Sequence, residues 1–272
     1  MGGDSVLGAL GSIVNTVFLV ISVYIYFALL RQVASRPSPS AVPATHRTFG
    51  LPEAVIALFL AVLFLFTSLG AANAPQVNLR TRDLIDTAVL EFGLVAFIAV
   101  FLRLRRFDLA QITGIARLTF RRAFLIGFVL LIVAYPLIAV ADWITARVLG
   151  ASASSRQGIV ELFSGSPSLE QRVLIILLAV AVAPLAEEFI FRFFLYGVLR
   201  RYAGRLVALV ISALLFAAVH AHLPSFAPLF VLGACFTLAY EWSGSLLVSM
   251  TMHSIFNSLT LLALAFPNTF EQ

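Results

Sequence analysis

Apolar runs of about 20 residues recur along nearly the whole chain and leave few ways for it to fold. An α-helix needs about 20 mostly apolar residues to cross the hydrocarbon core of a bilayer. Inside a bilayer only helices and closed barrels satisfy every backbone hydrogen-bonding group, and runs of this length are typical of helices. Charged residues make up only 11% of the chain, against about 25% in soluble domains. We therefore expect an all-α, polytopic helix bundle in a membrane.

The runs predict about eight transmembrane helices. Pro136 is expected to kink the fourth span, and the fifth span is expected to be long and tilted or broken near Pro184. The arginine-rich stretch 103–122 is expected to lie on the membrane surface as an amphipathic helix. We place the first four spans in an N-terminal region, 1–170, and the remainder in a C-terminal helical core, 171–266. The expected spans cover residues 6–30, 51–72, 84–102, 123–141, 172–201, 206–222, 226–242 and 245–266.

Arginine supplies all 18 basic side chains, because the chain has no lysine. Most arginines follow the first, third and fifth spans, which predicts that these loops are cytoplasmic and that the N-terminus lies outside. The net charge of +5 then reflects membrane topology, so we expect membrane lipid and no nucleic acid as a partner. The lack of lysine indicates a GC-rich coding sequence, and we expect the inner membrane of a bacterium.

Two adjacent carboxylates and a guanidinium interrupt the fifth apolar run in the string EEFIFR, residues 187–192. Ionised groups inside a membrane are costly and are usually retained for a function. Glu188 and Arg192 lie four residues apart, on one helical face where they can form a salt bridge. Glu187 points about 100° away from Glu188, which leaves its carboxylate free to act as a general base. The lone Glu91 of the third span is expected to be a hydrogen-bonded or interface-facing acid.

Two further polar clusters follow, in the strings FAAVH and HSIFN. The first places Phe216 and His220 on one face of the sixth span, and the second places His253 and Asn257 on one face of the eighth. Side chains paired in this way can hold a developing oxyanion, although His and Asn also make ordinary interhelical hydrogen bonds. At about 1.5 Å per residue, Glu187 and His220 lie deeper than His253. A shared site therefore requires tilted or broken helices.

The order EExxxR, FxxxH and HxxxN on successive helices resembles the CPBP intramembrane proteases, which include the type II CAAX prenyl endopeptidases. The resemblance covers roughly residues 171–262 and departs at Phe193, where many members have a small glycine; this departure bears on helix packing or substrate fit. It implies an endopeptidase that cleaves a membrane-associated protein or peptide, for example one of the prenylated CAAX type. In the family pattern Glu188 and Arg192 form a supporting pair.

The resemblance also implies the chemistry of the remaining motif residues. Glu187 would activate a water for attack on a peptide carbonyl, and His220 would position or polarise that water. His253 and Asn257 would stabilise the tetrahedral oxyanion. These roles agree with those that the helical spacing suggests.

A metal is the main alternative within this chemistry, because the family has been described both as metalloproteases and as glutamate-based proteases. Glu187, His220 and His253 would make a catalytic zinc set with water in the open position. The chain has no HExxH motif, and Asn257 is an unusual zinc ligand but a natural oxyanion donor. We therefore favour a water activated by Glu187 without a tightly held zinc.

Two other classes of function are compatible with these residues. Acids and histidines in membranes also build proton relays, so a proton-coupled transporter is one alternative; the absence of an evident internal repeat counts against it. The other alternative is a catalytically silent immunity or scaffolding protein of the same fold. A protease loses its biological effect on Glu187→Ala, whereas a silent scaffold keeps it.

Overall fold

The computed structural model of the protein describes residues 3–36, 48–72, 80–150, 163, 165 and 168–265. Within this part the ordered elements are helices, and seven of them are long and apolar enough to cross a membrane. The predictions of an all-α bundle and of an integral, multi-pass membrane protein are thereby confirmed. Most of the Pro/Ser-rich linker after the first span and half of the connection 142–171 lie outside the described residues.

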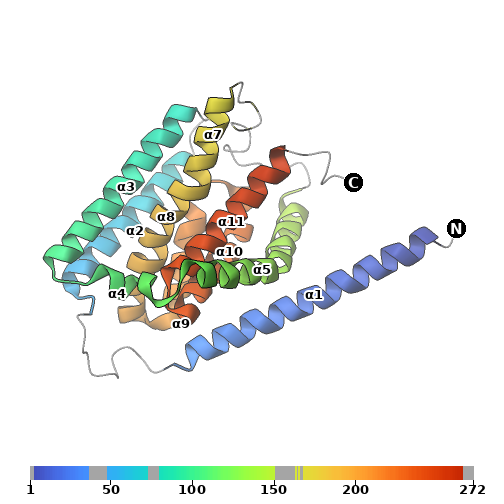
Figure 1. The fold of residues 1–272 in the computed structure, drawn as a ribbon, viewed down its shortest axis with the longest axis horizontal. Coiled ribbons are helices and arrows are strands. Elements are labelled where there is room, and N and C mark those ends of the chain that lie inside the picture. Colours follow the sequence, from blue (N-terminus) through green and yellow to red (C-terminus); the bar gives the residue numbers. More distant parts are fainter. Residues whose placement is uncertain are drawn as a thin grey trace.

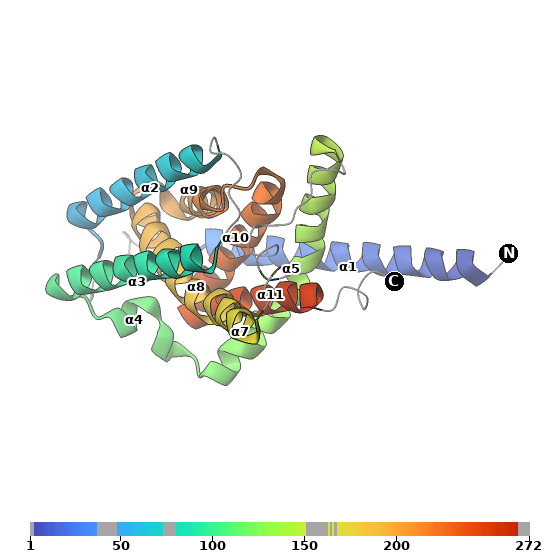
Figure 2. The ribbon, with the colours of Figure 1, turned by 90° about the horizontal axis from the view of Figure 1, so that it is seen from above.

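The first helices match the expected spans closely. They are α1 (Gly3–Ala34), α2 (Leu51–Ala72) and α3 (Thr81–Leu104). The fourth span is α5 (Phe120–Leu149), which contains Pro136 and continues beyond the end expected from hydropathy. The helix changes direction along its length in both views (Figures 1 and 2), as expected for a span with an internal proline.

The arginine-rich stretch does not form the single amphipathic helix that we expected. It folds into a short helix, α4 (Leu109–Thr113), and a 3₁₀ turn, η1 (Ile115–Arg117). Gly114 separates them with φ of 68°, a left-handed conformation that ends the helix. A Cβ at this position would also collide with the backbone of Gly244. The close approach of these two glycines explains why the helix cannot continue.

The fifth and sixth expected spans form one helical segment, Leu169–Val219. Gly204 interrupts it with non-helical angles, φ 80° and ψ 171°, at the place where a loop between the two spans was expected. Counting the segment once gives seven spanning helices, whereas dividing it at Gly204 recovers the eight that hydropathy predicts. In order, the segment contains α7 (Leu169–Leu177), η2 (Leu178–Val182), α8 (Ala183–Glu187), η3 (Glu188–Leu195) and α9 (Tyr196–Val219).

Two of these pieces, η2 and η3, are π-helical. In a π-helix each backbone N–H donates to the carbonyl five residues earlier, not four. The predicted break near Pro184 is therefore a change of helix type, and the helix itself continues through the proline. The last two spans are α10 (Leu223–Ser243) and α11 (Leu246–Ala265).

The segment α8 lies at the centre of the bundle, between α3 and α11 (Figures 1 and 2). α5 packs against α10 and α11, and α2 packs against α9. α1 contacts α5 and α10 through its C-terminal part, where Tyr26, Leu29 and Val33 are buried, while its N-terminal part extends beyond the other helices. The apolar core thus draws on both halves of the chain; the division near residue 170 stays a prediction.

The end of α10 around Glu241 is bonded both to α9 and to a residue just after α1. Glu241, near the end of α10, pairs with Arg200 at 2.6 Å and with Arg205 at 3.0 Å, both on α9. The guanidinium of Arg36, just after α1, donates to the backbone carbonyls of Glu241 at 2.6 Å and Trp242 at 2.9 Å. These arginines belong to the loops predicted to be cytoplasmic, so the contacts join the helix ends on that side.

Candidate active site

A cavity of about 780 Å³ opens between α3, α5, α10, α11 and the segment that carries α8. Four of the six predicted site residues line it: Glu187, His220, His253 and Asn257. The structure therefore brings together polar side chains from three expected spans. The other two predicted residues, Glu188 and Arg192, are fully buried behind the wall of the cavity.

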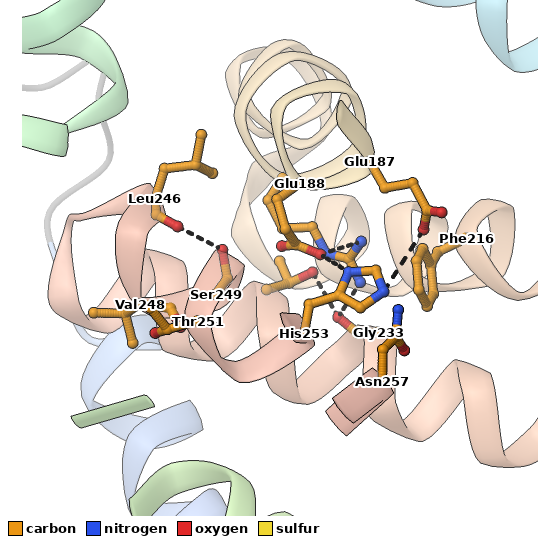
Figure 3. A network of polar contacts seen from close by, with 12 residues as sticks. Glu187, Glu188, Phe216, Gly233, Leu246, Val248, Ser249, Thr251, His253 and Asn257 are labelled. Carbon is orange, nitrogen blue, oxygen red and sulfur yellow. Dashed lines mark hydrogen bonds and ion pairs between the residues drawn. The ribbon is translucent and has the colours of Figure 1, made fainter. Parts of the chain in front are cut away.

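The acidic pair sits at a boundary between two helix types. Glu187 is the last residue of α8, and Glu188 is the first residue of the π-helical η3. Every residue of η3 is buried. The prediction from sequence assumed α-helical geometry here and missed the π-helix. The two carboxylates nevertheless point in different directions, as expected: Glu187 faces the cavity, and Glu188 faces the protein interior (Figure 3).

Glu188 and Arg192 form the predicted salt bridge. Glu188 Oε1 lies 3.0 Å from Arg192 Nη1, and neither side chain is exposed. The guanidinium also lies over the rings of Phe216 and Phe236, 4.0 Å and 5.2 Å from their centroids. A buried cation needs such partners because the interior solvates it poorly.

His253 is held by aromatic rings and by Glu188. Its ring stacks on Phe236 at 5.1 Å and meets Phe216 edge-on at 5.8 Å. Its Nδ1 lies 3.0 Å from Glu188 Oε1; an ionised carboxylate only accepts, so Nδ1 carries the proton. The other nitrogen, Nε2, lies 3.9 Å from Glu187 Oε2 (Figure 3). The ring is thus fixed with Nε2 toward the cavity.

Glu187 has the least satisfied carboxylate of the site. Its side chain is 15% exposed, and its Oε2 is buried without a hydrogen-bond partner among the described residues. Buried polar atoms usually find a partner, and exceptions in native structures often mark functional groups. The carboxylate is therefore placed to accept a hydrogen bond from a molecule in the cavity.

His220 ends α9, where it is the C-terminal cap. Its ring lies 4.9 Å from the ring of Phe216, so the two side chains share one helical face, as their spacing indicates. Its Nδ1 lies 2.8 Å from the backbone carbonyl of Phe216. Because a carbonyl oxygen only accepts, Nδ1 carries the proton, and neutral His220 offers Nε2 as a hydrogen-bond acceptor.

Asn257 lies one helical turn after His253 on α11, and both line the cavity as predicted. Its Nδ2 donates a hydrogen bond of 2.8 Å to the backbone carbonyl of Ala179 in η2. A side-chain amide has two N–H donors. One of them is therefore engaged by the main chain of a neighbouring helix, a contact that the sequence did not predict.

Glu91 is a cavity residue that the sequence interpretation missed. It lines the cavity from α3 and interacts electrostatically with Glu187, whereas we expected a hydrogen-bonded or interface-facing acid. A signal was present, since a lone carboxylate in an apolar span is itself unusual. Phe236, which stacks on His253, had no comparable signal because aromatic residues are frequent in apolar spans.

Phe193, the departure from the family pattern, does not line the cavity. Its side chain is buried and packs against Phe49, with the ring centroids 5.9 Å apart. Phe49 also lies 6.1 Å from Phe194 and 5.6 Å from Phe107. The substitution therefore acts on helix packing near the start of α2 and leaves the cavity wall unchanged.

The alternative zinc set, Glu187, His220 and His253, does not form a three-ligand group in the structure. Among the described residues, no three His, Cys, Asp or Glu side chains are arranged to hold a metal ion. The Glu187 Oε2 and His253 Nε2 atoms lie 3.9 Å apart, close to the separation of two ligands on one tetrahedral zinc, but His220 does not join them in a three-ligand group. The steps proposed below therefore use the side chains alone.

Known proteins resemble the part of the chain that forms this site. Residues 169–259 match the family model described as type II CAAX prenyl endopeptidase Rce1-like. The membrane-embedded CAAX protease MroQ of Staphylococcus aureus (strain USA300) is 27% identical over 38% of this chain and 49% of its own length. The chain thus matches about half the length of this curated relative. No solved structure matches the chain.

Proposed function

We propose that this chain, whose resemblance to the CPBP intramembrane proteases is confirmed over residues 169–259, is a membrane-embedded endopeptidase. The observation that carries the proposal is the single cavity lined by Glu187, His220, His253 and Asn257. Its substrate is a peptide bond of a membrane-associated protein or peptide. The S. aureus relative supports a bacterial membrane as the location.

Glu187 and His220 together are suited to activate a water molecule. Glu187 Oε2 is an acceptor without a hydrogen-bond partner in the described residues, and the bond from His220 Nδ1 to Phe216 makes Nε2 a second acceptor. A water that donates one hydrogen to each of them directs a lone pair toward a peptide carbonyl. Glu187 then takes the proton as the new C–O bond forms.

His253 and Asn257 are suited to stabilise the oxyanion that results. When Nε2 of His253 is also protonated, it donates toward the cavity, and Glu188 on Nδ1 stabilises the imidazolium. Asn257 contributes the N–H that Ala179 does not use. The tetrahedral intermediate collapses as the C–N bond breaks, and Glu187 returns its proton to the leaving amine. The products are a carboxylate and an amine.

The largest part of the cavity wall is apolar and suits an apolar peptide segment or a lipid-modified one. α3 contributes Leu84, Leu90 and Leu94, and α5 contributes Tyr135 and Ile138. The assay therefore compares a farnesylated CAAX peptide with the same peptide lacking the lipid. Preference for the farnesylated peptide assigns the chain to prenylated substrates, and equal cleavage assigns it to unmodified membrane peptides.

Replacing either catalytic histidine is expected to lower kcat by about 10²–10³-fold. The experiment follows peptide cleavage by the purified full chain in detergent, with His220→Ala and His253→Ala. His222→Ala is a matched control because His222 lines the same cavity and pairs with Ser225 at 2.8 Å. It is expected to stay within about threefold of the unchanged protein. Full activity in both catalytic-histidine variants would refute the proposal.

Removal of divalent metals is expected to leave hydrolysis unchanged. In the proposed reaction the activating group is the Glu187 carboxylate, and the lack of a three-ligand set among the described side chains supports this assignment. The measurement is the rate after dialysis against a strong chelator, compared with the rate after the same dialysis without it. A loss that added zinc restores would contradict this part of the proposal.

A further inference from the structure

We propose that Asn257 is a positioning residue. Its side chain replaces a backbone hydrogen bond that Pro184 cannot make, and it thereby fixes the position of α8, the helix that ends at Glu187. This inference rests on the proposed function only in that Glu187 is the general base. The observation is the 2.8 Å hydrogen bond from Asn257 Nδ2 to the carbonyl of Ala179, which joins α11 to η2. Ala179 lies four residues before Ala183, where α8 begins.

The carbonyl of Ala179 has lost both of its helical partners. In an α-helix it would accept from the N–H of Ala183, but that N–H donates to the carbonyl of Leu178, five residues earlier, as in a π-helix. In a continued π-helix it would accept from residue 184. Residue 184 is Pro184, which has no N–H.

Asn257 therefore supplies the donor that the backbone lacks. Ala179 is only 6% exposed and lies in a membrane span. A carbonyl buried to this extent is costly without a hydrogen-bond donor. The side-chain amide comes from α11, which packs directly against η2 and α8.

The same hydrogen bond joins the helix that carries His253 to the helical segment that carries Glu187. Asn257 lies one turn after His253 on α11, and Ala179 precedes the turn that ends at Glu187. Glu187 Oε2 lies 3.9 Å from His253 Nε2, a spacing that depends on how α8 sits against α11. Loss of the hydrogen bond frees the turn and moves the carboxylate relative to the histidine.

The positioning role is separable from oxyanion stabilisation because only the first depends on the proline. Pro184→Ala restores a backbone N–H at position 184, which can donate to the carbonyl of Ala179, five residues earlier, as the π-helical register requires. In that background the chain no longer needs the side-chain donor. A second N–H directed at an oxyanion is needed equally in both backgrounds.

The test is a double-mutant cycle in the full chain, with the unchanged protein, Pro184→Ala, Asn257→Ala and the double variant. Deuterium exchange of the backbone amides in 180–187 is followed by mass spectrometry. Asn257→Ala alone is expected to raise exchange by roughly five- to 100-fold, the equivalent of one unsatisfied buried carbonyl. In the Pro184→Ala background the same change is expected to have less than about a twofold effect.

Ser258→Ala is the matched control, because in the described part of the chain the hydrogen bond of Ser258 stays within α11, to the carbonyl of Ser254 at 2.7 Å. It is expected to leave exchange in 180–187 unchanged. In the cleavage assay, Asn257→Ala is expected to lower kcat with little change in KM, and Pro184→Ala to recover part of that loss. Kinetic recovery distinguishes positioning of Glu187 from a purely structural bond.

An equal effect of Asn257→Ala on exchange in both backgrounds would overturn the inference, as would recovery of exchange without any recovery of kcat. If the unchanged protein cleaves no peptide, the proposed function fails on its own. The exchange cycle still decides whether Asn257 compensates for Pro184.

Discussion

Glu187→Gln is expected to lower kcat for peptide hydrolysis by about 10²–10⁴-fold, the usual contribution of a positioned general base. The amide keeps the size of the carboxyl group but does not take a proton from water. KM is expected to change little, because the apolar wall of the cavity is untouched. The measurement is the initial rate of cleavage at several peptide concentrations.

Asp142→Asn is the matched control for that experiment. Asp142 is another acid that lines the cavity, but it is exposed on α5 and takes no part in the proposed reaction. Its variant is expected to retain the activity of the unchanged protein. If Glu187→Gln also retained full activity, Glu187 would not be the base.

The same variant separates the alternative classes of function. A silent scaffold keeps its biological effect in Glu187→Gln, whereas the protease loses it. A proton-coupled transporter loses proton-linked flux in liposomes, a readout that the protease does not require.

Glu188→Gln is expected to destabilise the protein by about 3–5 kcal/mol, the typical result of breaking a fully buried ion pair from one side. The change leaves Arg192 without its carboxylate in an interior where neither side chain is exposed. It also removes the ionic partner of His253 Nδ1. The measurement is the free energy of unfolding of the detergent-solubilised protein in a denaturant titration.

A second ion pair with the same spacing provides the control. Asp86 lies 3.8 Å from Arg82, four residues earlier on α3, and both side chains are largely exposed, at 69% and 88%. Asp86→Asn is therefore expected to leave stability unchanged within error. Equal stability of the Glu188 and Asp86 variants would show that the buried pair does not hold the site together.

Glu188→Leu combined with Arg192→Leu extends the prediction. Replacing a whole buried ion pair by apolar residues often preserves stability, so the double variant is expected to be more stable than Glu188→Gln. It is nevertheless expected to be inactive, because His253 has lost the carboxylate that orients its ring. Stability and activity would then be separated in one protein.

The positions of most spans were predictable because the bilayer sets both the length and the hydropathy of a helix, but the end of α5 at Leu149 and the joining of the fifth and sixth spans were not. The residues of the EExxxR, FxxxH and HxxxN strings were equally visible, since polar groups in apolar runs are rare and costly. The structure adds that Glu187, His220, His253 and Asn257 line one cavity; their catalytic roles stay proposals.

Local geometry was not predictable in the same way. In the π-helical segment η2 the carbonyl of Ala179 has no backbone donor, and the side-chain amide of Asn257, 78 residues later, donates to it instead. No local sequence pattern predicts such a distant partner. The glycine at 114 was visible in the sequence, but the close backbone of Gly244 that it accommodates was not. Contacts between distant segments decided both features.

The π-helical segment η2 also makes the span tolerant of a one-codon deletion at one place. Each π turn encloses one residue more than an α turn. Deleting one residue within 178–182 would let the π turn close as an α turn, so the side chains beyond it would keep nearly the same direction relative to α7. The same deletion in a regular α-helical turn would rotate them by about 100°. A relative that is one residue shorter before the acidic pair would therefore keep Glu187 directed at the cavity, and a one-residue gap at this place would not mark an inactive descendant.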